Sequence, residues 1–122
     1  MKILIIDDAR FQRGQMARML GELGHTVVEA VNGQEGYLKL CTEGPDAVIC
    51  DLLMPVMDGM AFLAMVQKHQ VQTPVIIVSA DIQTSTREEC FRLGAKAFVN
   101  KPCRPEDLAE ALRGVRAGGG QA

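Results

Sequence analysis

The chain lacks the sequence features of a small protein held together by metal ions or disulfides, of a secreted protein and of a membrane protein. Its 122 residues contain four cysteines at wide and irregular spacing with no C-x-x-C pair, so neither a cysteine-ligated metal site nor a disulfide framework is expected. No apolar run reaches the roughly 18 residues of a membrane span. The opening stretch MKILIID meets an acidic residue too early for a signal peptide. We therefore expect a cytoplasmic protein with no membrane contact.

The sequence also lacks the positive charge of a nucleic-acid binder. Thirteen Lys and Arg residues against 15 Asp and Glu residues give a formal net charge of -2, so nucleic acid is not expected as a partner. A hydrophobic fraction of 48% excludes a disordered chain. The length suits one domain, which we place at residues 1–116. A flexible glycine-rich tail at 117–122 is expected to follow it, with no output domain.

Five short apolar runs predict the strands of a parallel sheet. Most of them are β-branched and continuous rather than alternating, which is typical of strands buried on both faces. They lie at residues 3–6, 26–28, 47–50, 75–78 and 97–99. The segments between them have helical spacing of apolar residues. This alternation predicts five βα units in a doubly wound, three-layer α/β sandwich.

The ends of the predicted helices are marked by residue type. Gly44 and the proline after it close the second helix, and Pro105 is suited to the first turn of the fifth. For the fourth helix we expect Thr84 or Ser85 as the N-cap, with the acidic residues 88–89 near its positive end.

The predicted strands end in residues that can carry chemistry. In open α/β sheets, ligands bind beyond the carboxyl ends of the strands. The residues there are Asp7, Asp8, Asp51, Ser79 and Lys101. Two carboxylates about 4 Å apart repel by roughly 1 kcal/mol in water and about 4 kcal/mol at an effective dielectric near 20, so three of them need a cation. Oxygen ligands without a paired His or Cys favour Mg²⁺.

This residue set is suited to phosphoryl transfer. Asp51 would act as a carboxylate nucleophile toward phosphorus, and Ser79 and Lys101 would bind the incoming phosphoryl oxygens. The alternative interpretation is that each Asp at a strand end is only a helix cap or a turn former. The occurrence of suitable residues at four strand ends, in one chain order, favours the shared site.

Four stretches of sequence resemble the receiver domains of two-component response regulators. They are IIDD at 5–8, DLLMPVMDG at 51–59, VSA at 78–80 and GAKAFVNKP at 94–102. The resemblance covers about residues 2–116, and its layout is close to that of the single-domain chemotaxis regulators. It implies a flavodoxin-like fold with strand order 2-1-3-4-5.

The resemblance also implies roles for particular residues in a magnesium site. Asp51 matches the phospho-acceptor. Asp7 and Asp8 match the acidic pair that holds Mg²⁺, with Asp8 and Asp51 as direct ligands and Asp7 acting through water. The backbone carbonyl of Leu53 matches a further ligand.

The remaining matches concern the response to phosphorylation. Ser79 matches the switch hydroxyl, Phe98 the aromatic switch position, and Lys101 the lysine that pairs with the phosphoryl group. The bond between Lys101 and Pro102 matches a cis peptide. The Asp58–Gly59 pair matches the turn into the third helix.

The function implied is that of a stand-alone phosphorylation switch and not of an enzyme, apart from slow hydrolysis of its own acyl phosphate. A histidine kinase would supply the phosphoryl group. The surface formed by the fourth helix, fifth strand and fifth helix would then change shape and contact a protein target. A flagellar motor switch and a phosphatase are candidate targets, and the interpretation as a chemotaxis protein rests on the layout alone. The expected state is a monomer or a weak, phosphorylation-linked dimer.

Two other functions remain open at this point. A magnesium-dependent aspartyl-phosphate phosphatase would need a second acid two residues after its nucleophile, where this chain has Leu53, and a cap domain. A pseudo-receiver would only bind a partner, although here each site position is filled by a competent residue. Labelling by acetyl phosphate separates these alternatives from the switch.

Overall fold

Strands and helices alternate throughout the part of the chain described by the computed structural model, which covers residues 1–119 and side chains as far as Arg116. The strands are β1 (Lys2–Ile6), β2 (Thr26–Ala30), β3 (Ala47–Asp51), β4 (Val75–Ser79) and β5 (Ala97–Asn100). The helices are α1 (Arg10–Glu22), α2 (Gly33–Glu43), α3 (Gly59–Lys68), α4 (Thr84–Arg92) and α5 (Pro105–Gly119). All strand pairings are parallel, in the order β2-β1-β3-β4-β5, which confirms the predicted fold class and strand order.

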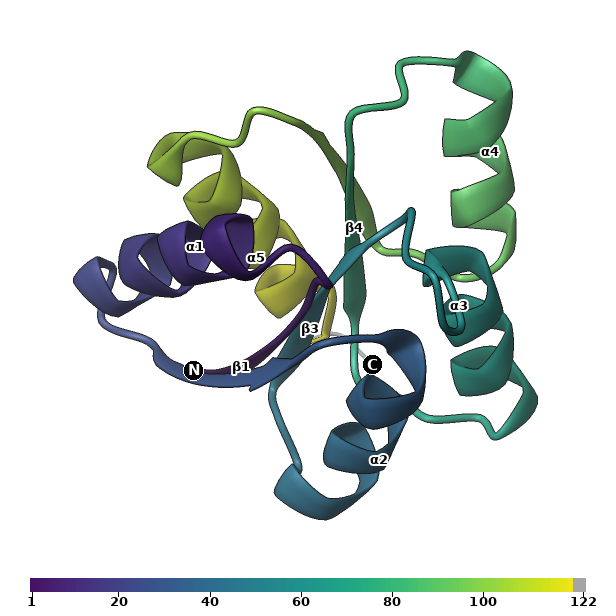
Figure 1. The fold of residues 1–122 in the computed structure, drawn as a ribbon, viewed down its shortest axis with the longest axis horizontal. Coiled ribbons are helices and arrows are strands. Elements are labelled where there is room, and N and C mark those ends of the chain that lie inside the picture. The colour runs from purple at the N-terminus through teal and green to yellow at the C-terminus, as the bar shows by residue number, and fades with distance from the viewer. Residues whose placement is uncertain (120–122) are drawn as a thin grey trace.

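The sheet lies between two layers of helices. Figure 1 shows α1 and α5 on one face and α2, α3 and α4 on the other. Each face has its own hydrophobic core. The core under α1 and α5 includes Ile3, Ile5, Met16, Leu20, Ile49, Leu108 and Leu112. The core under the other three helices includes Leu4, Ile6, Leu40, Val48, Phe62, Leu63 and Cys90.

Burial on both faces explains the continuous apolar strands. Residues 3–6 of β1 and 47–50 of β3 are all buried, and alternate side chains enter opposite cores. The register pairs Asp51 of β3 with Val78 of β4, and Ser79 of β4 with Asn100 of β5. The polar residues that follow these strands are therefore delivered to one edge of the sheet.

Local residue preferences account for most helix ends. Gly44 ends α2 in the left-handed conformation, with φ of 59°, as glycine allows at little cost. Asp58 caps α3 by accepting a hydrogen bond from the backbone N–H of Ala61 at 2.9 Å. This cap confirms the expected turn into the third helix.

The predicted start of α4 is wrong. The helix begins at Thr84, and its N-cap is Gln83, whose side chain makes no capping hydrogen bond. The first turn contains no acidic residue, so residues 88–89 do not face the positive helix end as expected. The physical reason is that the carboxylate of Asp81 accepts hydrogen bonds from the Gln83 N–H at 2.8 Å and from the Thr86 hydroxyl at 2.9 Å. Asp81 thus holds the turn before α4, and neither Thr84 nor Ser85 caps the helix.

The carboxyl-terminal end of the chain is described only in part. Helix α5 starts at Pro105, as expected, and continues to Gly119, into the segment for which we expected a tail. The rest of that expected tail, residues 120–122, lies outside the described residues. Among the helices that are described, none combines the length and the apolar composition needed to cross a bilayer.

Candidate metal site at the edge of the sheet

Three carboxylates meet where β1 and β3 end side by side. Asp7 and Asp8 follow β1, Asp51 is the last residue of β3, and one oxygen from each lies within 4.8 Å of the others. Asp7 is buried, Asp51 half-buried and Asp8 exposed. The structure therefore brings together the three acids that the sequence predicts, with one side of the cluster open to solvent.

The buried carboxylate of Asp7 supports the metal assignment. Its side chain is 1% exposed, and its Oδ1 accepts a hydrogen bond from the Ala9 N–H at 2.8 Å. Its Oδ2 is buried and has no hydrogen-bond partner among the described residues. A buried polar atom without a partner costs about 1–3 kcal/mol, more when charged. An oxygen of this kind beside two further carboxylates fits the all-oxygen donor set of Mg²⁺.

The ammonium of Lys101 supplies the nearest positive charge. Its Nζ lies 3.2 Å from Oδ1 of Asp51 and 3.5 Å from Oδ2 of Asp7. The peptide bond between Lys101 and Pro102 is cis, as the resemblance implied. Burial raises the pKa of the Asp51 carboxyl; Lys101 opposes this rise, and the charge of Asp7 adds to it. The site therefore still favours additional positive charge.

The two predicted switch residues lie in neighbouring strands, Ser79 at the end of β4 and Phe98 within β5. Ser79 is 1% exposed, and its hydroxyl oxygen accepts a hydrogen bond from the Asp81 N–H at 3.0 Å. The carbonyl of Ser79 accepts another from the Lys101 N–H at 2.9 Å, which ties the lysine loop to the end of β4. Phe98 is half-buried and packs against the core beneath α2, α3 and α4.

The loop after Asp51 passes close to the start of α3. A Cβ added at Gly59 would lie 2.8 Å from both the carbonyl oxygen of Asp51 and the Cα of Leu52, so only glycine fits there. The Gly59 N–H donates to the Leu52 carbonyl at 2.8 Å. Leu53 is 69% exposed at the rim of the site, and its carbonyl ligand role stays a prediction.

Two residues with contacts at the site were missed by the sequence analysis, and both lie in α1. The amide oxygen of Gln12 accepts a hydrogen bond from the Lys101 ammonium at 3.0 Å. Arg13 donates to the carbonyl oxygen of Asp7 at 2.7 Å and to the Glu29 carboxylate at 2.9 Å. Neither residue stands in a motif, and neither contact follows from local spacing because the partners belong to different elements.

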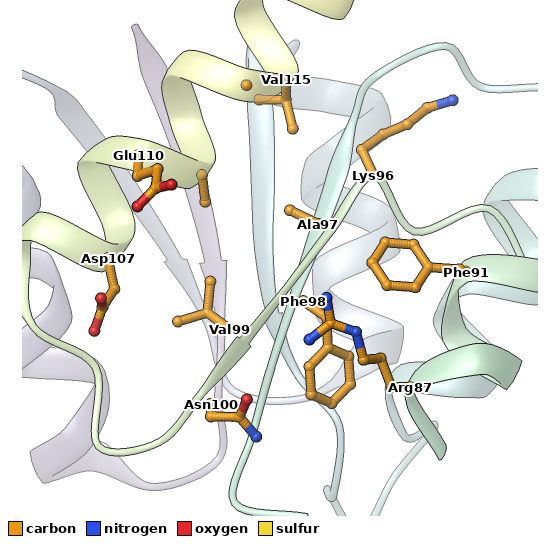
Figure 2. A pocket seen from close by; sticks show the side chains of 12 residues that line it. Arg87, Phe91, Lys96, Ala97, Phe98, Val99, Asn100, Asp107, Glu110 and Val115 are labelled. Carbon is orange, nitrogen blue, oxygen red and sulfur yellow. The ribbon is translucent and has the colours of Figure 1, made fainter. Parts of the chain in front are cut away.

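A groove on another side of the molecule is lined by α4, β5 and α5 (Figure 2). Its volume is about 550 Å³. Arg87 and Lys96 contribute positive charge, and Asp107 and Glu110 of α5 contribute negative charge. The guanidinium of Arg87 lies 5.9 Å from the ring centre of Phe98, within the range of a cation–π contact. The predicted aromatic switch residue thus lines this groove.

Comparisons with known proteins find a matching family model and relatives that align with most of this chain. The family model described as response regulator receiver domain matches residues 3–113. Chemotaxis protein CheY of Thermotoga maritima is 35% identical, over 93% of this chain and 96% of the relative. The positive alginate biosynthesis regulatory protein of Pseudomonas aeruginosa is 36% identical over 93% of this chain, which spans only 46% of that relative's length.

The solved structures include close matches to the fold. A chain in the crystal structure of the CheX–CheY–BeF3–Mg²⁺ complex from Borrelia burgdorferi matches with a TM-score of 0.89 and 27% sequence identity. The match covers 94% of this chain and 88% of that one.

Proposed function

This chain belongs to the response regulator receiver domain family, and on that premise we propose that it is a phosphorylation switch with Asp51 as its acceptor. The observation that carries the proposal is the clustering of Asp7, Asp8 and Asp51, whose oxygens lie within 4.8 Å, with the Lys101 ammonium 3.2 Å from Asp51. We place the switch in the cytoplasm, as a signalling module and not as an enzyme.

The proposed reaction transfers a phosphoryl group from a phosphohistidine of a histidine kinase. A carboxylate oxygen of Asp51 forms a bond to phosphorus as the bond from phosphorus to the histidine nitrogen breaks, and the imidazole leaves with the electron pair. The Lys101 ammonium stabilises the negative charge on the phosphoryl oxygens. Mg²⁺, which Asp7, Asp8 and Asp51 would hold with the Leu53 carbonyl, supplies further charge neutralisation when bound.

The switch step involves Ser79. Its hydroxyl would turn to donate a hydrogen bond to a phosphoryl oxygen, and the space that it leaves would be filled by Phe98. The hydrogen bond that Ser79 now accepts from the Asp81 N–H would then be lost, which links this step to the loop before α4. A change from 1:99 to 99:1 between two conformations takes about 5.5 kcal/mol of differential stabilisation. Charge-assisted bonds to a doubly negative group contribute part of that.

The proposed output surface is the groove lined by α4, β5 and α5. Phe98 and Arg87 line this groove, so a movement of Phe98 would change its shape. The target is a protein; a flagellar motor switch or a phosphatase fits the chemotaxis interpretation suggested by the CheY relatives. We propose a monomer or a weak dimer linked to phosphorylation. Water would later hydrolyse the acyl phosphate, which resets the switch.

Incubation with acetyl phosphate tests the proposal. With Mg²⁺ present, intact mass spectrometry should record the gain of one phosphoryl group, which chelation of the metal or the Asp51→Asn variant should abolish. A wild-type protein that never gains mass would support a pseudo-receiver and contradict the switch. Rapid multiple turnover of small phosphate esters would support a phosphatase and contradict it as well.

A further inference from the structure

The ammonium of Lys101 has three acceptor groups around it. Its Nζ lies 3.2 Å from a carboxylate oxygen of Asp51 and 3.5 Å from one of Asp7, and it donates a hydrogen bond to the neutral amide oxygen of Gln12 at 3.0 Å. The amide oxygen is the nearest of the three. The Lys101 side chain is only 17% exposed, so water offers few alternative partners. Gln12 therefore contributes directly to where this ammonium sits.

The contact joins two elements that are far apart in the sequence. Gln12 lies in the first turn of α1, 89 residues before Lys101. An exposed glutamine loses side-chain entropy when it is fixed, so the hydrogen bond must offset that cost. A cavity of about 370 Å³ lies beside this contact and is lined by Gln12 and Lys101. Gln15, which lies one turn further along α1, lines the same cavity. Its side chain makes no hydrogen bond within the described part of the chain, and it provides a matched control.

We propose that Gln12 is a positioning residue that holds the Lys101 ammonium for phosphoryl transfer to Asp51. The role rests on the proposed function of Asp51. The neutral amide oxygen accepts one hydrogen bond from the ammonium and adds no charge to the site. The other protons stay available on the side of the carboxylates, where the phosphoryl charge would develop. A carboxylate at position 12 would hold the lysine as well, but it would add a fourth negative charge to the site.

The Gln12→Met variant tests this role because methionine keeps the length and removes the acceptor. We expect Asp51 to be labelled by acetyl phosphate about threefold to tenfold more slowly, as for loss of a hydrogen bond to a charged group that is partly exposed to solvent. Affinity for Mg²⁺, measured by calorimetry, should stay within about twofold because the carboxylates are unchanged. The Gln15→Met variant should match the wild type in both measurements. A merely structural role for Gln12 would lower both values together.

A second measurement does not depend on phosphorylation. In a nitrogen–proton NMR spectrum, the Lys101 ammonium should give a signal protected from rapid exchange in the wild type and in Gln15→Met, but not in Gln12→Met. Persistence of the signal in Gln12→Met, or labelling as fast as in Gln15→Met, would overturn the inference and leave the proposed function intact. Failure of the wild type to label would instead contradict the proposed function, and with it this role.

Discussion

At the scale of single residues, Asp7 has the least satisfied side chain in the site. Its Oδ2 is buried without a hydrogen bond in the described structure, and two further carboxylates lie within 4.8 Å. Among the described residues, Lys101 is the cation that forms an ion pair with this carboxylate, at 3.5 Å. Two repulsions against one attraction, together with the cost of burial, make the metal-free site a source of instability.

We therefore expect Asp7→Asn to stabilise the metal-free protein. The amide removes one charge, and its N–H can donate toward the neighbouring carboxylates, so the free energy of unfolding should rise by about 1 kcal/mol. Thermal unfolding in EDTA measures this difference. In Mg²⁺ the order should reverse, because bound metal stabilises the wild type and the variant lacks a ligand charge. A lower melting temperature for the variant in EDTA would contradict the repulsion.

A second prediction concerns His25, which lies at the opposite end of the strands. Burial lowers its pKa, and the N-terminal ammonium and Arg116 lower it further. Its Nδ1 lies 3.1 Å from the N-terminal nitrogen. Because the native state binds the proton more weakly than the unfolded chain, stability is full above about pH 6.5 and is lost as the pH falls to the native pKa.

The pH dependence of stability tests this sign. Between about pH 7.5 and about pH 5, the urea midpoint of the wild type should fall further than that of His25→Gln, which has no ionisable group there. An equal fall in the urea midpoint of the two proteins would show that protonation of His25 does not contribute to the pH dependence of stability.

At the scale of elements, α4 depends on Asp81 for its start. The side chain of Gln83, the N-cap residue, makes no capping hydrogen bond. The Asp81 carboxylate accepts hydrogen bonds from the Thr86 hydroxyl and from the Gln83 N–H. The N–H of Asp81 donates to the Ser79 hydroxyl. One residue therefore connects the proposed switch hydroxyl with the first turn of α4.

Thr86→Val tests this connection, since valine keeps the branched shape and a similar helix propensity. We expect a loss of about 1 kcal/mol in stability, and faster amide hydrogen exchange at the start of α4 with unchanged protection in the sheet. Ser85→Ala is the control, because the hydroxyl of this exposed residue makes no hydrogen bond in the described structure. Unchanged exchange in Thr86→Val would remove Asp81 from this role.

Most of the secondary-structure elements could be predicted from the sequence, but the cap of α4 and the contacts between elements could not. Apolar runs and local preferences predict the strands, their burial and the end of α2 at Gly44. The family resemblance predicts the turn into α3 at Asp58. The cap of α4 was mispredicted because Asp81, outside the helix, holds the turn that leads into it. The contact of Gln12 with Lys101 could not be predicted, since it depends on how α1 packs beside the end of β5.

At the scale of the whole molecule, the two cores hold the sheet so that one edge gathers the site. Arg13 connects α1 with the carbonyl of Asp7 and with Glu29, which lies in β2. Phe98, which lies in β5 of the same sheet, lines the groove of α4, β5 and α5. The same sheet therefore carries both the acidic site at Asp51 and one wall of the groove.

The most direct measurement is to map the phosphorylated residue. Borohydride reduces an aspartyl phosphate to homoserine, which peptide mass spectrometry locates after treatment with acetyl phosphate. The account predicts homoserine at position 51 only, in the presence of Mg²⁺ and not after chelation. Homoserine at another position, or an equal yield at position 51 without Mg²⁺, would contradict it.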